Sequence, residues 1–177
     1  MIYVWDATLL VHAQSADRAD VLGDLIPTGR HITTDAVYAE INAGVPRWIE
    51  VVPSPQTDEF IASLITWRHR CGAAHGRNEG EASVLAYVDA SFEENTAVID
   101  DGPARTVGVR HLGAHRVHGS LWLLCQGILE DPSRRMSVSR FCDAMLSDGI
   151  RWPFGPRGIR EVGIDGRVAL IAPCRGL

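Results

Sequence analysis

The segment Ile2-Tyr3-Val4-Trp5-Asp6-Ala7-Thr8 opens the sequence with a short apolar run that ends at a carboxylate. Such a run predicts a buried strand over Ile2–Trp5, because both faces of a strand inside a parallel sheet are covered. Further apolar runs follow, separated by stretches with helical spacing. Strands that alternate with helices predict a parallel sheet covered by helices. We therefore expect an α/β fold, a three-layer α/β/α arrangement with a central, mainly parallel sheet.

The expected strands and helices alternate through residue 128. The expected strands are Ile2–Trp5, His31–Thr33, Ile49–Val52, Thr96–Ile99 and His115–Val117. The expected helices are Thr8–Ala13, Ala19–Ile26, Asp35–Ala43, Asp58–Arg70, Asn78–Ala90, Ala104–Val109 and Ser120–Ile128. The pattern then changes to a helix over Val138–Leu146 and two short strands, Glu161–Ile164 and Val168–Ile171, around a hairpin signal. We expect one domain over residues 1–132 and an extension over residues 133–177 that packs on it.

Composition narrows the class of protein. A chain of 177 residues is long enough for one α/β domain with a sizeable core. The net charge of −5 argues weakly against a nucleic-acid partner, although total charge is a poor guide to a local patch. The sequence has no lysine, so Arg supplies the positive charge besides histidine. Without a long apolar run or a basic leader, we expect a cytoplasmic protein that does not span a membrane. The four scattered cysteines are expected to be reduced thiols.

Carboxylates follow two of the expected strands. Asp6 comes directly after the first strand, and Asp100 and Asp101 come after Thr96–Ile99. In parallel sheets, ligands bind outside the carboxyl ends of the strands. Ordinary roles compete with this interpretation, since Asp6 is also a suitable helix N-cap and the pair of aspartates could form a solvent-exposed turn.

Three candidate glutamates lie on the expected helices. Glu40 falls inside Asp35–Ala43 on the apolar face, where burial would be costly unless the carboxylate is paired, binds metal or reaches solvent at the edge of that face. Glu79 and Glu81 open the helix Asn78–Ala90, where Asn78 and Glu81 resemble a capping box.

Taken together, these acids can converge on one crevice. Like charges packed together repel, and a divalent cation relieves the repulsion. Mg²⁺ or Mn²⁺ is the expected cofactor because hard cations prefer oxygen ligands. Such a site can activate water against a phosphodiester. Arg105, one turn of helix beyond Asp101, could hold a flanking phosphate or pair structurally with an acid, and Arg77 and Arg110 are weaker phosphate candidates.

The order and spacing of these motifs resemble the PIN-domain family, in the bacterial branch of VapC-like toxins and stand-alone relatives. The motifs are Asp6-Ala7-Thr8, Val37-Tyr38-Ala39-Glu40-Ile41, Gly80-Glu81-Ala82 and Ile99-Asp100-Asp101-Gly102-Pro103-Ala104-Arg105. The resemblance covers roughly residues 1–129. It implies a metal-dependent endoribonuclease in which the catalytic, metal-binding acids are Asp6, Glu40, Glu81, Asp100 and Asp101, with either or both aspartates of the last pair as ligands.

The same resemblance implies supporting residues and partners. Thr8 matches a small polar position that supports the site, and Ser120 matches a residue that lines the pocket. Many relatives carry an acid where this chain has Ser83, so the third ligand stays open between Glu79 and Glu81. The substrate would be RNA. In the toxin branch the resemblance further implies a homodimer and a cognate antitoxin.

Other classes fit less well. A phosphoacceptor receiver domain needs a lysine, and nucleotide-binding glycine motifs are absent. The spacing of His111, His115 and His118 matches no zinc motif. The main alternative is a non-catalytic module with a PIN fold that binds nucleic acid or protein, because a fold does not guarantee activity.

Overall fold

A computed structural model describes residues 1–41, 44–73, 77–91, 94–149 and 166. The chain forms two compact units that interleave along the sequence. The first unit comprises Met1–Val11 and Gly29–Gly119, and the second comprises His12–Thr28 and Ser120–Leu177. Each unit takes residues from two parts of the chain and is not a sequential domain. The expected boundary between a domain over residues 1–132 and an extension over residues 133–177 stays a prediction.

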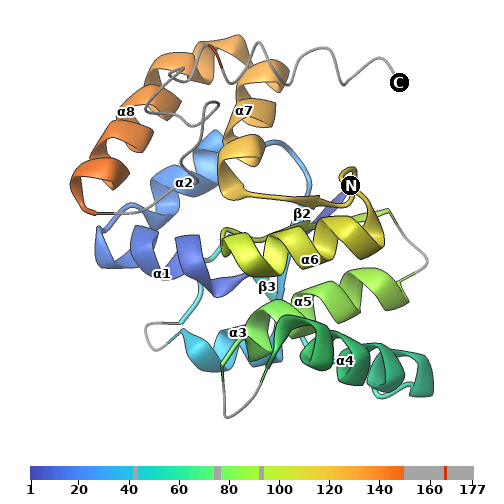
Figure 1. Cartoon of the computed structure of the whole chain (residues 1–177). Coiled ribbons are helices and arrows are strands. Elements are labelled where there is room, and N and C mark those ends of the chain that lie inside the picture. The colour runs from blue at the N-terminus through green and yellow to red at the C-terminus, as the bar shows by residue number, and fades with distance from the viewer. Residues whose placement is uncertain (42–43, 74–76, 92–93, 150–165, 167–177) are drawn as a thin grey trace. The chain divides into compact units, whose positions relative to one another are not determined.

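A five-stranded parallel sheet forms the core of the first unit, in the order β3-β2-β1-β4-β5. Figure 1 labels β2 and β3 of this sheet behind the helices that cover it. Its strands are β1 (Ile2–Trp5), β2 (Arg30–Thr34), β3 (Glu50–Val52), β4 (Asn95–Val98) and β5 (Val117–His118). The central strand β1 buries Tyr3, Val4 and Trp5, which explains why its sequence is a continuous apolar run. The α/β class and the parallel, helix-covered sheet are thus confirmed, in agreement with the three-layer expectation. The five strands expected between Ile2 and Val117 lie within two residues of β1 to β5.

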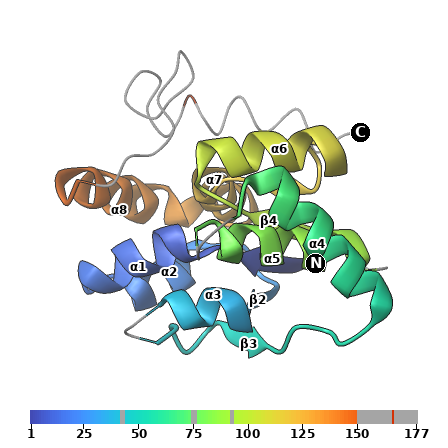
Figure 2. The same cartoon turned by 60° about the horizontal axis from the view of Figure 1, so that its bottom comes forward.

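Four helices complete the first unit, and α1 (Ala7–Ser15) begins in it. They are α3 (Asp35–Glu40), α4 (Asp58–Cys71), α5 (Glu79–Ala90) and α6 (Gly102–Leu112). Helix α5 packs against β1, β2 and β4 and is flanked by α3, α4 and α6; Figure 2 shows α4 running along the outside of α5. Because α5 opens beside the carboxyl ends of the strands, its first turn belongs to the same region as the strand-end acids.

Local capping explains where these helices begin. The side chains of Thr34, Thr57 and Asp101 each accept a backbone N–H three residues ahead, at 3.3, 3.2 and 2.7 Å. Such caps satisfy N–H groups that have no partner within the helix. Helix α4 ends at Gly72, whose left-handed backbone (φ 64°) is the usual glycine stop.

The expected helix Asp35–Ala43 is too long. Helix α3 ends at Glu40, and the next residue, Ile41, has an extended backbone. Ile41 is buried, so the chain leaves the helix in order to place this side chain in the core. Glu40 is consequently the last helical residue and is exposed, rather than buried well inside a helix.

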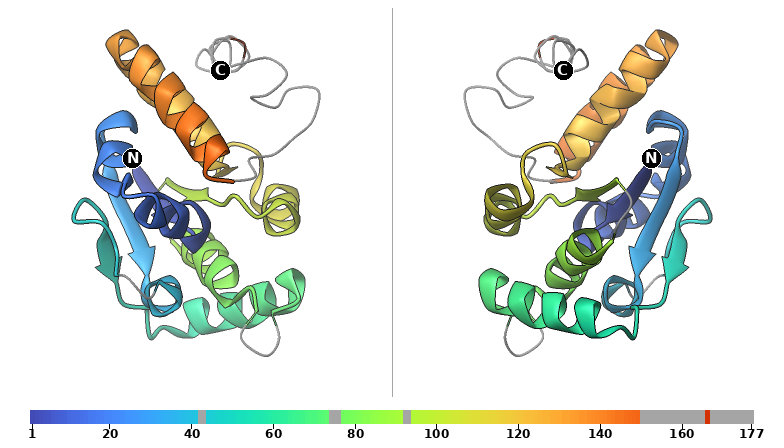
Figure 3. Two further views of the ribbon diagram at one scale, coloured as in Figure 1. Left: turned by 90° about the vertical axis from the view of Figure 1, so that its left-hand side faces the viewer. Right: turned by 90° about the vertical axis from the view of Figure 1, so that its right-hand side faces the viewer.

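The second unit is helical in the part that the structure describes. It contains α2 (Ala19–Leu25), α7 (Ser120–Glu130), the 3₁₀ helix η1 (Pro132–Arg134) and α8 (Arg135–Ser147), with the end of α1. Helices α7 and α8 lie side by side (Figure 3), and α2 contacts both. A Cβ atom on Gly127 of α7 would lie 2.0 Å from the carbonyl oxygen of Leu25, so only glycine permits this approach. The expected helix Val138–Leu146 is confirmed as the central part of α8.

Other expectations for the C-terminal part fall outside the described residues, among them the hairpin of Glu161–Ile164 and Val168–Ile171. The three cysteines that the structure describes, Cys71, Cys125 and Cys142, form no disulfide. None of the described helices combines the length and the apolar character that crossing a membrane requires.

Candidate functional site

The carboxyl ends of β1 and β4 form a topological switch point. After β1 the chain crosses to β2 on one side, and β4 later occupies the other side. Ligands of open parallel sheets bind in the crevice outside such a point. Asp6 follows β1 directly, and Asp100 and Asp101 follow β4 after one further residue. The backbone N–H of Asp6 donates to the carbonyl of Val98 at 3.0 Å, which holds the two strand ends side by side.

Asp6 is the most deeply buried of the candidate acids, with 3 % of its surface exposed. Its Oδ1 accepts the N–H of Ala7 at 2.6 Å, and its Oδ2 accepts the hydroxyl of Thr8 at 2.9 Å. These are not the amides of the second and third helical residues, so Asp6 is not an ordinary N-cap. Burial, together with the nearby charges of Glu81 and Asp100, raises the pKa of Asp6 to about 7, although the Thr8 bond opposes the shift.

The first turn of α5 separates the roles of Glu79 and Glu81. Glu79 forms an ion pair with Arg68 of α4, with 2.7 Å between Nη2 and Oε1. Glu81 is half-buried, and its pKa is raised first by burial and then by the charges of Glu40 and Asp101. Of the two glutamates left open by the sequence, Glu81 therefore lies within the group of acids, and Glu79 is engaged by an arginine.

Glu40 reaches α5 through the backbone. Its Oε1 accepts the N–H of Gly80 at 2.8 Å. A Cβ atom at Gly80 would lie 2.9 Å and 3.0 Å from the two carboxylate oxygens, so a larger residue there would displace the Glu40 side chain. The capping box expected at this helix is wrong, because Asn78 makes no side-chain cap bond and instead donates to the carbonyl of Cys71 at 2.9 Å. A carboxylate from α3 satisfies the amide in its place.

Ser83, where many PIN proteins carry an acid, belongs to a buried hydroxyl network. Its Oγ lies 2.6 Å from the hydroxyl of Thr34, the N-cap of α3, and donates to the carbonyl of Gly80 at 2.8 Å. Together with the Glu40 contact, this network fixes both the N–H and the C=O of Gly80. The residue that follows, Glu81, is thereby held at the edge of the group of acids.

The two aspartates after β4 also differ. Asp101 caps α6 by accepting the N–H of Ala104 at 2.7 Å, and its charge acts on Glu81. The charge of Asp100 instead contributes to the raised pKa of Asp6. Arg105 donates from Nη1 to the carbonyls of Ile99 and Asp100 at 3.0 and 3.2 Å. This guanidinium therefore supports the turn that presents both aspartates, as a structural partner of the backbone.

Gly119 and Ser120, the two residues that follow β5, have different surroundings. Ser120 is buried at the first position of α7 and belongs to the second unit. The Cα of Gly119 lies close to the aspartate turn, since a Cβ there would be 3.1 Å from Oδ1 of Asp100. The role of Ser120 as a residue that lines the pocket stays a prediction.

Cys71 is a neighbour of the acids that the sequence did not indicate. It is half-buried at the end of α4. Burial and the charges of Glu81 and Asp101 raise the pKa of its thiol to about 11, while Arg70 partly opposes the shift. The thiol therefore stays protonated near neutral pH.

The acids are thus close enough to perturb one another, and their oxygens are the kind that hard divalent cations prefer. None of the ion pairs among the described residues involves Asp6 or Glu81. The described residues nonetheless contain no group of three or more histidine, cysteine, aspartate or glutamate side chains in the arrangement of a metal site. The donor chemistry fits a metal ion, whereas a shared coordination sphere is not formed.

Comparison with known proteins adds no assignment. No protein-family model, curated protein or solved structure matches this chain. The interpretation of the site therefore depends on its own residues.

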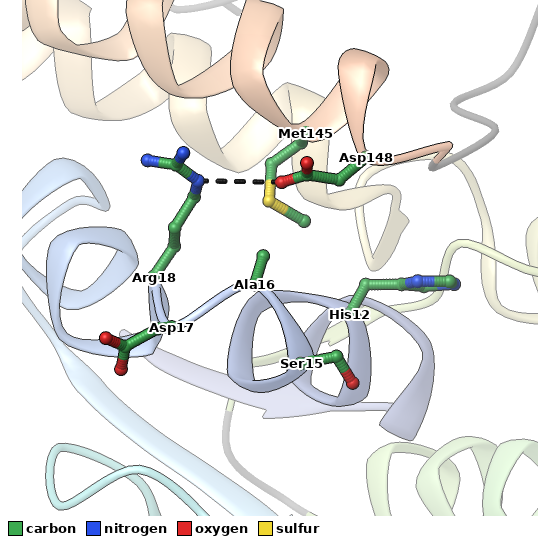
Figure 4. A pocket seen from close by; sticks show the side chains of 7 residues that line it. All are labelled: His12, Ser15, Ala16, Asp17, Arg18, Met145 and Asp148. Carbon is green, nitrogen blue, oxygen red and sulfur yellow. Dashed lines mark ion pairs between the residues drawn. The ribbon is translucent and has the colours of Figure 1, made fainter.

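A separate pocket of about 450 Å³ lies in the second unit (Figure 4). Its lining combines both signs of charge and comprises His12, Ser15, Ala16, Asp17, Arg18, Met145 and Asp148. Arg18 faces Asp148 with 3.7 Å between Nε and Oδ2, and this buried Nε has no hydrogen-bond partner. None of the predicted acids lines this pocket. No motif in the sequence indicates it, because α1 and α8 come from opposite ends of the chain.

Proposed function

We propose that this chain is a Mg²⁺- or Mn²⁺-dependent endoribonuclease of the PIN-domain type. The observation that carries the proposal is that Asp6, Asp100, Asp101 and Glu81 lie near the switch point of a parallel sheet, where their charges act on one another. Sheets of this kind bind their ligands at that position. Membership of the PIN family rests on the order of the sequence motifs.

Charge supports a cation at this position. Asp6 is buried beside two other carboxylates, and neither it nor Glu81 has an ion-pair partner among the described residues. Isolated buried carboxylates are costly, so they are usually paired, protonated or bound to metal. Asp6, Glu81 and Asp100 would hold the ion, and Asp101 would contribute the oxygen that the helix cap leaves over. A bound divalent ion supplies an activated water and stabilises charge on the phosphate.

The remaining residues position these ligands. Thr8 donates to Oδ2 of Asp6 and so orients that carboxylate. Glu40 holds the first turn of α5 through Gly80, and this places Glu81. Arg105 steadies the aspartate turn through the carbonyls of Ile99 and Asp100. Residues that orient metal ligands often matter for affinity as well as for geometry.

The proposal extends to the biological setting. RNA is the substrate class that the PIN resemblance implies, and a homodimer and an antitoxin partner follow from its toxin branch. A cytoplasmic location is proposed from the sequence, which has neither a long apolar run nor a basic leader. None of these features depends on the geometry of the acids.

The decisive experiment is cleavage of a mixed pool of single-stranded and structured RNA by the purified full chain. We expect cutting with Mn²⁺, no cutting with EDTA, and loss of cutting in Asp6→Asn. Asp24→Asn is the matched control, because Asp24 is an exposed aspartate of α2 outside the group of acids. Full activity of Asp6→Asn would overturn the proposal. A folded protein that neither cuts RNA nor binds Mn²⁺ would favour the non-catalytic binding module.

A further inference from the structure

Basic side chains gather at the C-terminal ends of two neighbouring helices of the first unit. The last turn of α4 carries Arg68, His69 and Arg70, and the last turn of α6 carries Arg110 and His111. Cations at helix C-termini complement the helix dipole, which is the ordinary explanation for such residues. That explanation, together with the ion pair to Glu79, is sufficient for Arg68.

Arg70 is held in place by an aromatic ring rather than by an acid. Its guanidinium carbon lies 4.9 Å from the centre of the ring of Trp67, which is fully buried. Arg70 is exposed and takes part in none of the ion pairs among the described residues. A guanidinium stacked on a ring keeps the donors at its edge available, and this fork suits phosphate oxygens.

A histidine from the neighbouring helix contacts the same ring. The imidazole of His111 meets Trp67 edge-on, with 5.8 Å between ring centres, so the ends of α4 and α6 share one indole. His111 and its neighbour Arg110 are both exposed. Asp89 accepts the indole N–H of Trp67 at 2.9 Å. The buried ring of Trp67 thus contacts both Arg70 and His111.

This basic surface adjoins the group of acids. The side chain of Asn78 donates to the carbonyl of Cys71, the residue after Arg70, at 2.9 Å, and so joins the end of α4 to the start of α5, where Glu81 lies. The thiol of Cys71 also experiences the charges of Arg70, Glu81 and Asp101. One thiol therefore lies within electrostatic reach of both the acids and the first cation of the surface. An anionic chain whose one phosphate lies at the acids could place a neighbouring phosphate near Arg70.

We propose that Arg70, Arg110 and His111 form a track that binds the phosphates of single-stranded RNA beside the acids. This inference rests on the proposed ribonuclease function and adds the path of the substrate. A phosphate at the acids requires metal, whereas the flanking phosphates require cations of the protein. The local positive charge also explains how a chain of net charge −5 can bind RNA.

The test measures RNA binding separately from cleavage. Fluorescence anisotropy with a labelled single strand of about 20 nucleotides is recorded for the full chain in EDTA over a series of KCl concentrations. Arg70→Gln should weaken binding about 3- to 10-fold and reduce the slope against log salt by about 0.7. Arg70→Glu should lose more and Arg70→Lys less, because charge accounts for most of the contact.

Arg47→Gln is the matched control, since Arg47 is an exposed arginine of the first unit outside the track and loses the same charge. Equal RNA affinity of the Arg47→Gln and Arg70→Gln chains would overturn the track. The track would also be overturned if Arg70→Gln lost binding to polyglutamate but not to RNA, which would indicate an acidic protein partner. Equal thermal midpoints for Arg70→Gln and Arg70→Lys exclude a folding defect.

Kinetics distinguish this inference from the proposed function. With Mn²⁺, Arg70→Gln should raise KM and leave kcat unchanged, because the arginine acts before the chemical step. If the wild-type chain cuts RNA and Arg70→Gln cuts it equally well at low RNA concentration, the track fails while the ribonuclease stands. If RNA binding depends on Arg70 and no RNA is cut, the ribonuclease fails while the track stands.

Discussion

Asp6 and Glu40 are both acids of one predicted site, yet the structure holds them in opposite ways. Asp6 is buried at the end of a central strand, where burial and neighbouring charges raise its pKa to about 7. Glu40 is exposed at the end of α3 and accepts the N–H of Gly80 at 2.8 Å. The difference shows that position decides the role of a carboxylate. The carboxylate of Glu40 joins two helices across 40 residues, whereas that of Asp6 accepts only from its near neighbours Ala7 and Thr8 and is buried close to other acids.

Cleavage should show the largest difference between the two acids. Asp6→Asn should lower kcat/KM for RNA with Mn²⁺ by more than about 100-fold, because it removes the charge and one carboxylate oxygen of a proposed metal ligand. Glu40→Gln should cost less than about 10-fold, because the amide oxygen still accepts the N–H of Gly80. Equal losses of kcat/KM in the two variants would indicate that Glu40 contributes to catalysis as much as Asp6, and would contradict the difference proposed between the two acids.

Stability without metal should depend on pH through Asp6. Its pKa is 3.8 as a model carboxyl and about 7 in the folded chain, so between these values the folded state retains a proton that the unfolded chain has lost. The contribution of Asp6 is fully present below about pH 4 and is lost as the pH rises through about 7, a change on the order of 2–4 kcal/mol. Urea unfolding in EDTA at about pH 5 and about pH 8 measures this change.

Asp6→Asn supplies the control for that titration. The variant should lose stability less steeply over the same pH range, with a smaller decline left from Glu81, whose pKa is also raised. Adding Mn²⁺ at the higher pH should stabilise the wild-type chain more than the variant. A wild-type chain as insensitive to pH as Asp6→Asn would contradict the burial of an uncompensated carboxyl.

The smallest effect should come from the contact of Glu40 with α5. Gly80→Ala places a Cβ against both carboxylate oxygens, which displaces this flexible side chain and should cost on the order of 1 kcal/mol of unfolding free energy, about the value of one hydrogen bond. The double variant Glu40→Ala/Gly80→Ala removes the carboxylate and relieves the clash. Its loss should therefore be smaller than the sum of the two single losses in a double-mutant cycle. Simple additivity would mean that the two residues do not act on each other.

Patterns of apolar spacing predicted the parallel sheet and most helices. Strands that are buried on both faces are continuous apolar runs, and helices that pack on a sheet have apolar residues at helical spacing. The strand-end acids Asp6, Asp100 and Asp101 were predictable for a related reason, since parallel strands end at the same edge. The contact between Glu40 and Gly80 was not, because it joins residues 40 positions apart and depends on where α3 ends. The position of Cys71 near the acids and the pocket lined by Arg18 and Asp148 were not predictable either, because no local sequence motif marks them.

The interleaving of the two units has a consequence for the order of folding during synthesis. Arg134 donates to the carbonyl of Ile26 across 108 residues, and Glu130 accepts the N–H of Thr28 across 102 residues. A ribosome releases α2 long before the helices against which it packs. Contacts of such separation form late and slowly. We therefore expect the apolar side chains of Leu22 and Leu25 to stay accessible to chaperones for most of translation.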